Sequence, residues 1–230
     1  MTHELPSVER LAQLLRPFLE APAGDAASLP PLPLSPAHFE QFRAYLALLL
    51  RWNERMNLTA VRDPEQAVRR HFGESLFVAR YLAARRNEGT LPAGATLLDV
   101  GSGAGFPGLP VQIAFPQMQV MLAEGQAKKA AFLREAVRTV SASAEVWAAR
   151  VESLPPERHF DAVTLRAVDR MAEALETARR RVRPGGVLVA LGSRQLESRR
   201  LSTPQPGSTQ AEATVLTVPC SDILLISKDL

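Results

Sequence analysis

Cysteine is nearly absent from this chain of 230 residues, and Cys220 by itself cannot form an internal disulfide. Cys220 also shares no zinc-ligand spacing with any of the four histidines, so the sequence predicts no metal site. We expect Cys220 to be a small buried hydrophobic residue, which is the usual state of an unpaired cysteine.

Long apolar runs and targeting segments are missing as well. No stretch approaches the roughly 20 apolar residues of a membrane span, and residues 1–10 lack the basic and then apolar pattern of an export signal. We therefore expect a cytoplasmic protein with no membrane partner. The length suits one α/β domain with a modest extension, and we expect a monomer.

Lysine is scarce too, because Lys128, Lys129 and Lys228 are the only lysines among 27 basic residues. The formal net charge is +3 and the isoelectric point is about 9.5, which permits a polyanionic partner without requiring one. Arginine suits phosphate groups and guanine edges. A preference for arginine can equally reflect genome composition.

The first ninety residues have a helical pattern. Apolar residues recur at helical spacing over residues 11–18 and 39–52. Ser35-Pro36 and Asp63-Pro64 each suit the start of a helix. The Pro-rich residues 21–36 interrupt this pattern and are expected to form a linker or a loosely ordered arm.

From residue 96 onward, short β-rich runs alternate with segments long enough for crossover helices, which predicts a parallel sheet wound by helices. The β-rich runs are residues 96–100, 119–123, 145–148, 161–165 and 187–191, and the main helical segments are residues 128–140 and 171–182. The strand-like residues 213–218 and 223–227 are separated by only four residues. Four residues cannot hold a crossover helix, so this last pair is expected to be antiparallel.

Five parallel strands followed by an antiparallel hairpin make up the seven-stranded, Rossmann-like sheet of class I S-adenosylmethionine methyltransferases. A plain dinucleotide-binding fold would instead continue with further βαβ units. We therefore predict this α/β fold, with an S-adenosylmethionine-binding methyltransferase domain over residues 91–230. A helical N-terminal extension over residues 1–90 precedes it.

A glycine-rich turn follows the first predicted strand. Gly103, Gly105 and Gly108 match the pattern G-x-G-x-x-G, in which glycine lets the backbone approach a ligand closely. Glu124 follows Gly103 by 21 residues at a strand end, where it could hold ribose hydroxyls. Taken alone, this arrangement is also the fingerprint of a nicotinamide dinucleotide site.

Two neighbours of the glycines favour a different nucleotide. Asp99 precedes the turn, where an anion would oppose a pyrophosphate but suits a sulfonium or an amino group. Pro107 removes an amide that a phosphate could use. S-adenosylmethionine, a cationic nucleoside without phosphates, fits better, and we expect Asp99, Gly101 and Gly103 to bind it.

Later strand ends supply further candidates at the same edge of the sheet, where such folds place ligands. Val151 and Glu152 occupy the turn after the third predicted strand, and Arg166 ends the fourth. Glu152 suits a cofactor site and a solvated loop equally well, whereas Arg166 is expected to project into the cleft. Residues 183–186 are explained as a helix stop before the fifth strand.

Taken together, these features resemble the bacterial ribosomal small-subunit RNA guanine-N7 methyltransferases, a family also called glucose-inhibited division protein B. The glycine motif alone indicates only a methyltransferase, but its combination with the upstream segments is specific to this family. The resemblance covers residues 41–228 and lies in Trp52-Asn53, Asn57-Leu58-Thr59, Arg70-His71-Phe72, Glu74-Ser75-Leu76, Asp99 to Gly108, Lys128-Lys129, Phe132-Leu133, Arg150-Val151-Glu152 and Arg166-Ala167.

The resemblance implies methyl transfer from S-adenosylmethionine to N7 of a guanine in the decoding-region loop of 16S ribosomal RNA, in the free RNA or the small ribosomal subunit. Matched residue by residue, the cofactor would contact Gly101, Phe106, Val151-Glu152 and Arg166, with Glu124 at the ribose position. The chain departs from the family pattern in the Pro-rich stretch before Pro36, which is longer than expected, and at two motif positions. Glu74 stands where an aspartate is usual, and Gly192-Ser193 replaces a Lys-Gly pair.

Guanine N7 carries a lone pair and no proton, so positioning beside the sulfonium could supply most of the acceleration. We predict Arg166 as the catalytic residue, orienting rather than transferring protons, and His71 as structural in the first instance. Arginines of the helical region are candidates for phosphate contacts. They are Arg51, Arg55, Arg62, Arg69 and Arg70.

Three other functions remain open from the sequence. The literal glycine pattern supports a nicotinamide-dependent oxidoreductase, which the terminal hairpin opposes. The missing Lys-Gly pair leaves room for a non-catalytic RNA-binding or ribosome-assembly protein on the same fold. A methyltransferase for a small molecule is the third.

Overall fold

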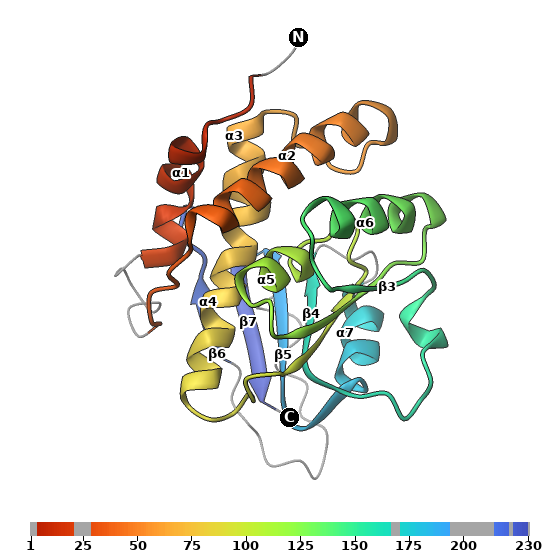
Figure 1. The fold of residues 1–230 in the computed structure, drawn as a ribbon. Helices are drawn as coiled ribbons and strands as arrows, with labels where there is room; N and C mark the ends of the chain where they lie inside the picture. The colour runs from red at the N-terminus through yellow and green to blue at the C-terminus, as the bar shows by residue number, and fades with distance from the viewer. Residues whose placement is uncertain (1–3, 21–28, 167–170, 194–213, 221–222, 230) are drawn as a thin grey trace.

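The computed structural model describes residues 4–20, 29–166, 171–193, 214–220 and 223–229. Their strands form one seven-stranded sheet in the order β3-β2-β1-β4-β5-β7-β6 (Figure 1). The strands are β1 (Thr96–Val100), β2 (Gln119–Ala123), β3 (Glu145–Trp147), β4 (Phe160–Arg166), β5 (Val182–Ser193), β6 (Thr214–Thr217) and β7 (Ile223–Asp229).

The pairing of the strands confirms the predicted fold class. The first five strands pair in parallel, and β7 lies antiparallel between β5 and β6. The strand order reverses direction between β1 and β4, so the carboxyl ends of these two strands border the crevice where open α/β sheets bind ligands.

Helices precede and cover the sheet. They are α1 (Val8–Glu20), α2 (Pro36–Met56), α3 (Pro64–Ala67), a π-helical turn η2 (Val68–Gly73), α4 (Glu74–Asn87), α5 (Gly108–Ala114), α6 (Ala127–Thr139), a 3₁₀ turn η3 (Val151–Ser153) and α7 (Met171–Arg179). None of the helices in these described stretches is long and apolar enough to span a membrane.

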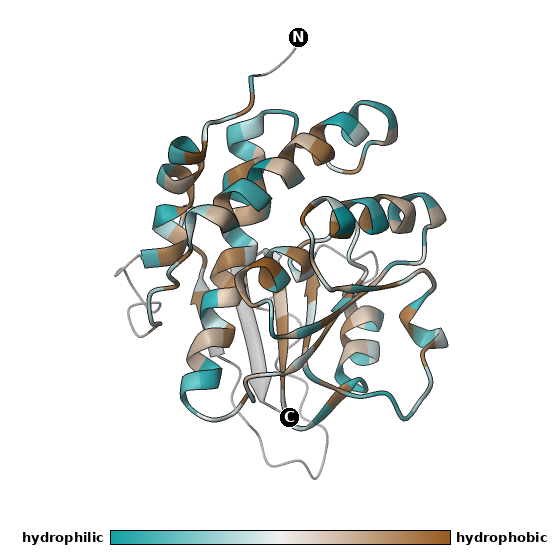
Figure 2. Ribbon diagram, in the orientation of Figure 1, coloured by the Kyte–Doolittle hydropathy of each residue, from teal (hydrophilic) through white to brown (hydrophobic). Residues whose placement is uncertain are grey.

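Side chains that alternate between the two faces of the sheet divide the interior into two cores. Leu97 packs in a large core with α1, α2, α4, α5 and α6, whereas its neighbour Leu98 packs in a smaller core with α7 and η3. Successive strand side chains point to opposite faces, so each central strand must be apolar on both. Figure 2 shows the hydrophobic residues concentrated on these central strands.

The described part of the Pro-rich segment is packed against the helices. Leu29 and Leu32 are buried. Arg80 of α4 donates from Nε to the carbonyl of Pro30 at 2.7 Å and from Nη2 to the carbonyl of Leu29 at 2.6 Å. Residues 29–35 lie between α1 and α2 outside any helix or strand, as a linker does, but the alternative of a loosely ordered arm is wrong for them, because Arg80 binds the backbone there. Residues 21–28 lie outside the described part of the chain.

Two local predictions are also wrong. Residues 183–186 do not stop a helix, since α7 ends at Arg179 and β5 begins at Val182. They instead form an irregularity in β5 opposite Phe160, with Gly185 at φ 75°. Cys220 is exposed rather than buried, because it lies in the turn before β7 with φ 54°.

Candidate cofactor site

The glycine-rich turn joins β1 to α5 through a left-handed backbone. Gly101, Gly103 and Gly105 have φ values of 65°, 57° and 90°, a region that strongly favours glycine. The turn begins at the carboxyl end of β1, beside the reversal of strand order. The sequence pattern therefore predicts both the place and the backbone conformation of this turn.

Asp99 lies beneath the turn and is fully buried. Its Oδ2 accepts from the amide of Gly108 at 3.1 Å, and its Oδ1 accepts from Thr164 Oγ1 at 2.9 Å. Burial raises the pKa of Asp99 from its ordinary 3.8 to about 6, against the lowering effect of these hydrogen bonds. One carboxylate oxygen of Asp99 thus holds the start of α5, and the other holds the neighbouring strand β4.

Glu124, the predicted ribose ligand, also holds the turn. Its Oε2 accepts from the amide of Gly103 at 2.9 Å, and its Oε1 accepts from the amide of Gln126 at 2.8 Å. Each carboxylate oxygen has a second lone pair, so these bonds leave capacity for ribose hydroxyls. The spacing of 21 residues between Gly103 and Glu124 therefore corresponds to a direct contact.

A cleft of about 310 Å³ lies at the carboxyl edge of the sheet beside this turn. Three of the predicted cofactor residues, Gly101, Val151 and Glu152, line it. Val100, Ala123 and Ala174 supply apolar walls, and Glu173 supplies a second acid. The volume is at the lower end of the range for small-molecule sites, about 300 to 1,000 Å³.

Arg181 supports one wall of this cleft and was not predicted. Its buried guanidinium donates to the carbonyls of Val151, Leu154 and Pro155 at 3.3, 2.8 and 2.6 Å. Five donors in a fixed plane suit a cluster of carbonyls on one loop. Because Arg181 comes 30 residues after Val151, no local sequence pattern could have indicated this contact.

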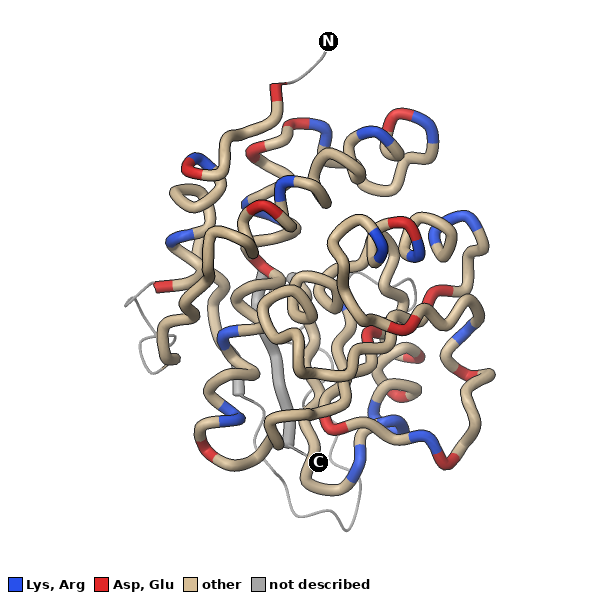
Figure 3. The backbone as a smooth tube through the Cα atoms, in the orientation of Figure 1, with Lys and Arg blue, Asp and Glu red and all other residues tan. Residues whose placement is uncertain are grey.

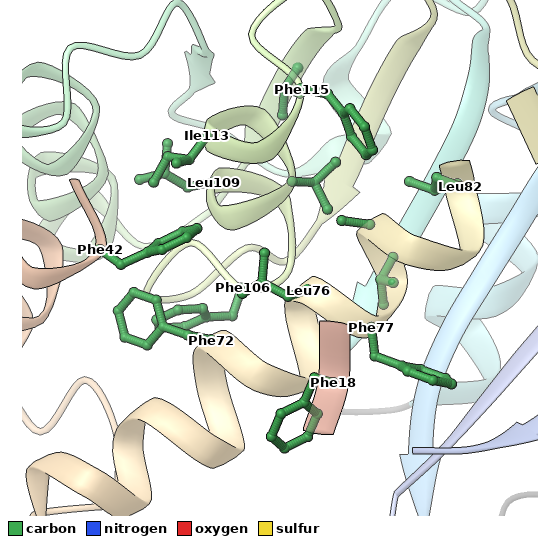
Figure 4. Packing of buried hydrophobic residues seen from close by; sticks show 14 of the residues in the cluster. Phe18, Phe42, Phe72, Leu76, Phe77, Leu82, Phe106, Leu109, Ile113 and Phe115 are labelled. Carbon is green, nitrogen blue, oxygen red and sulfur yellow. The ribbon is translucent and has the colours of Figure 1, made fainter. Parts of the chain in front are cut away.

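Phe106 lies on the other side of the turn, within the large core. Its ring stacks on Tyr45 at 5.3 Å and on His71 at 5.0 Å between ring centroids. Figure 4 shows Phe106 beside Phe72, which meets it edge-on at 5.2 Å. Phe106 therefore joins the glycine turn to the helices that precede the sheet.

Arg166 at the end of β4 also faces these helices. Its Nη2 lies 2.6 Å from Oε2 of Glu74, which is fully buried, and 2.7 Å from the carbonyl of Arg70. The π-helical turn η2 brings Arg70 and Glu74 to this position, and such turns are frequent at functional sites. The Glu74 departure from the family pattern thus falls on the ion-pair partner of Arg166.

His71 occupies the same π-helical turn. Its Nε2 lies 2.7 Å from Thr59 Oγ1, and its Nδ1 is buried without a hydrogen-bond partner among the described residues. Burial, together with the positive charges of Arg166 and Arg70, lowers the pKa of His71 from 6.5 to about 3. The ring is therefore neutral in the folded protein at physiological pH.

His71 should make the fold sensitive to acid. The unfolded chain takes up a proton at this residue near pH 6.5, but the folded chain does so only near pH 3, so its contribution to stability falls below pH 6.5. Between pH 7.5 and 5 this loss amounts to about 2 kcal/mol, at roughly 1.4 kcal/mol per pH unit.

Asp99 acts in the opposite direction, because its raised pKa makes the fold take up a proton near pH 6. Between pH 7.5 and 5 the wild type should therefore lose about 2 kcal/mol more stability than His71→Gln, because the other titrating groups are common to both proteins. Chemical denaturation of both proteins at the two pH values measures this difference. Equal pH dependence in the two proteins would contradict the assignment of a neutral His71.

The predicted cofactor residues thus fall into three groups rather than one. Gly101, Val151 and Glu152 line the cleft. Gly103 lies within the turn, and Asp99 and Glu124 hold the turn through hydrogen bonds to its amides. Phe106 and Arg166 face the N-terminal helices. The expectation that Arg166 projects into the cleft is therefore wrong, because Glu74 and the carbonyl of Arg70 hold its guanidinium on the helical side. For the two strand residues the cause is the alternation of side chains along a strand. Asp99 and Arg166 point to the face of the sheet opposite that of Val100 and Leu165.

The sequence of this chain also matches a known protein family. Residues 38–221 match the model of the family described as rRNA small subunit methyltransferase G. This match covers most of the chain and includes nearly all of α2, the glycine-rich turn and the strands up to β6.

Individual relatives agree. The ribosomal RNA small subunit methyltransferase G of Stenotrophomonas maltophilia (strain R551-3) is 40% identical over 190 residues, which are 82% of this chain and 79% of that protein. The protein of the same description from Xanthomonas euvesicatoria pv. vesicatoria (strain 85-10) is 43% identical over 148 residues, covering 64% of this chain and 65% of its own length. Among solved structures, a precorrin-6y C5,15-methyltransferase from Geobacter metallireducens GS-15 is 15% identical with a TM-score of 0.49, covering 64% of this chain and 85% of its own.

Proposed function

This chain belongs to the rRNA small subunit methyltransferase G family, and we propose that it transfers a methyl group from S-adenosylmethionine to N7 of a guanine in the decoding-region loop of 16S ribosomal RNA. The observation that carries the proposal is the cleft beside the glycine-rich turn, lined by Gly101, Val151 and Glu152. We further propose that the protein acts in the cytoplasm as a monomer, with residues 1–90 as a helical N-terminal extension of the methyltransferase domain.

The chemistry of the cleft suits S-adenosylmethionine. Val100, Ala123 and Ala174 offer apolar surface for an adenine ring. Glu152 and Glu173 outnumber Arg150 among the charged residues that line the cleft, which favours a cationic ligand. A pyrophosphate would meet these acids unfavourably. Glu124 keeps acceptor capacity at the carboxyl end of β2, which suits ribose hydroxyls.

When bound, S-adenosylmethionine supplies an electrophilic methyl group: the N7 lone pair forms the new N–C bond, the S–C bond breaks, and its electron pair remains on sulfur. No proton leaves the base, so the chain needs no general base. Its contribution is to hold the two reactants in line and to exclude water. Arg166, fixed by Glu74, is the residue we propose to orient the substrate or the cofactor.

The RNA contact is proposed for exposed arginines of the helical region, which Figure 3 shows interleaved with acids. Arg51 pairs with Glu135 at 2.6 Å and Arg62 donates to Asn57 and to the carbonyl of Asn53. Arg55 and Arg70 are exposed and form no ion pair with another described residue. They are therefore the cations most available for phosphates.

Neutralising both should weaken RNA binding and reduce its salt dependence. In the double variant Arg55→Gln, Arg70→Gln, the slope of log affinity against log salt should become shallower by roughly 0.7 to 0.9 for each phosphate that is no longer neutralised. A matched control is Arg16→Gln, Arg180→Gln, which removes the same charge from exposed i,i+4 pairs. Fluorescence titration with a 16S RNA fragment at several salt concentrations measures the slopes, and equal slopes in the two double variants would contradict the assignment.

A direct assay tests the function. The purified protein is incubated with methyl-labelled S-adenosylmethionine and small ribosomal subunits or 16S RNA that lack the modification, and the labelled nucleotide is identified by mass spectrometry. We expect one N7-methylguanine in the decoding-region loop. Label at a guanine atom that bears a proton, binding of NAD in place of S-adenosylmethionine, or RNA binding without transfer would each overturn the proposal.

A further inference from the structure

Tyr45 of α2 reaches the glycine-rich turn from the helical side of the molecule. The side chain is fully buried, and its hydroxyl donates to the carbonyl of Ala104, 59 residues later in the chain. Burial raises the pKa of Tyr45 well above 10, so the hydroxyl keeps its proton and remains a donor.

The ring of Tyr45 also fixes the neighbouring part of the turn. It stacks on Phe106 with an angle of 11° between the ring planes, and it meets Phe72 edge-on at 5.1 Å. A side chain at Gly105 would collide with the Tyr45 hydroxyl, so glycine at that position is required by Tyr45 as well as by its φ of 90°. The turn and the tyrosine therefore fit as a pair.

The other anchors of the turn come from the sheet. The amide of Ser102 donates to the carbonyl of Ala123 at 3.0 Å, and the amide of Gly103 donates to Glu124. These bonds fix the first half of the turn. Residues 101–105 contain three glycines with left-handed φ, which lose more conformational freedom on ordering than other residues. In the second half, the amides of Gly105 and Phe106 donate to the carbonyl of Ser102 at 2.7 and 3.2 Å, and the chain turns into α5. Tyr45 adds the side-chain bond that holds Ala104 from the helical side.

We propose that Tyr45 is a positioning residue for the cofactor, which holds residues 104–106 so that the turn is ordered before the ligand binds. The inference rests on the proposed function and extends it, because it assigns part of the cofactor site to the helices before residue 90. A preorganised loop binds more tightly because less ordering is required on binding.

The Tyr45→Phe variant tests this role. Removing one buried hydrogen bond should weaken binding of S-adenosylhomocysteine by about three- to tenfold, measured by isothermal titration calorimetry. The KM for S-adenosylmethionine should rise by a similar factor, while kcat at saturating cofactor and the KM for RNA stay near the wild-type values. A merely structural role would not produce this division between kcat and KM.

Tyr81→Phe is the matched control. Tyr45 and Tyr81 are the only tyrosines of the chain, and Tyr81 is buried in α4, about two helical turns beyond Glu74. Its variant loses the same hydroxyl and should bind the cofactor product like the wild type. Equal weakening in both variants, or binding by Tyr45→Phe within a factor of two of the wild type, would overturn the inference.

A second measurement uses the wild-type sequence, in case Tyr45→Phe does not fold. Labelling with 3-fluorotyrosine gives two fluorine resonances, which Tyr81→Phe assigns. Because the turn is ordered before binding, the Tyr45 resonance of the free protein should already be a single narrow line. A broadened or doubled Tyr45 line that sharpens only on addition of S-adenosylhomocysteine would overturn the inference. If the wild type does not bind S-adenosylhomocysteine at all, both the proposed cofactor and this inference are overturned. If the wild type binds it and Tyr45→Phe binds it equally well, only the inference is overturned.

Discussion

Arg166→Met should lower the free energy of unfolding by about 3 to 5 kcal/mol, the usual cost of removing one partner from a buried ion pair. Glu74 is fully buried, and the Arg166 side chain is 11% exposed, so water can do little to replace the guanidinium. The carbonyl of Arg70 loses a donor at the same time. Urea denaturation of the variant and the wild type measures the effect.

The same substitution should slow methyl transfer for a separate reason. If Arg166 orients the substrate or cofactor, losing a charge-assisted hydrogen bond of roughly 1.5 to 3 kcal/mol slows turnover by about ten- to over a hundredfold. Single-turnover rates on folded protein report this loss. Above neutrality the rate should show no steep pH dependence, because His71 is neutral there, Asp99 with its pKa of about 6 is ionised, and N7 releases no proton.

A second substitution separates the two effects. In the double variant Arg166→Met, Glu74→Gln, a neutral amide replaces the buried carboxylate. Most of the stability lost in Arg166→Met should therefore return, while turnover stays low. Arg180→Met is the control, because Arg180 forms an exposed i,i+4 pair with Glu176 and should be nearly neutral in both measurements. Recovery of turnover in the double variant would mean that Arg166 acts on structure alone.

Gly108→Ala should lower the free energy of unfolding by about 3 kcal/mol or more. An added Cβ would lie 2.5 Å from Leu122 Cδ2, 2.8 Å from Asp99 Cβ and 2.9 Å from Asp99 Oδ2. Asp99 Cβ is fixed to the backbone of β1, and Asp99 and Leu122 are both fully buried, so little room exists for their side chains to move away. The bond from the Gly108 amide to Asp99 would be broken as well.

Gly94→Ala provides the matched control for this prediction. The nearest atom to its added Cβ is the carbonyl oxygen of Gln117 at 4.0 Å, and its φ is not left-handed. Its stability should stay the same or rise by about 0.4 to 1 kcal/mol, because alanine restricts the unfolded chain. Thermal unfolding of both variants, with and without S-adenosylhomocysteine, measures the contrast. Similar melting temperatures for the two variants would show that the turn tolerates a side chain at residue 108.

Much of the fold could be predicted from periodicity and spacing. The runs at residues 96–100 and 119–123 coincide with β1 and β2, and the four-residue connection before residue 223 correctly predicts an antiparallel pair. These features depend on local geometry, since apolar strands and short connections have few alternatives. The irregular start of β5 could not be predicted, because its Pro-Gly-Gly residues suit a helix stop equally well.

The sequence by itself determined the glycine-rich turn, the link from Gly103 to Glu124 and the family to which the chain belongs. Each of these depends on residues whose spacing is fixed by the turn or by one βα unit. Only the tertiary structure decided that Asp99 lies beneath the turn, that Glu74 pairs with Arg166, and that Tyr45 holds Ala104. Those contacts join segments up to 92 residues apart, and they depend on which face of a strand or helix each side chain occupies after packing, which spacing along the chain does not specify.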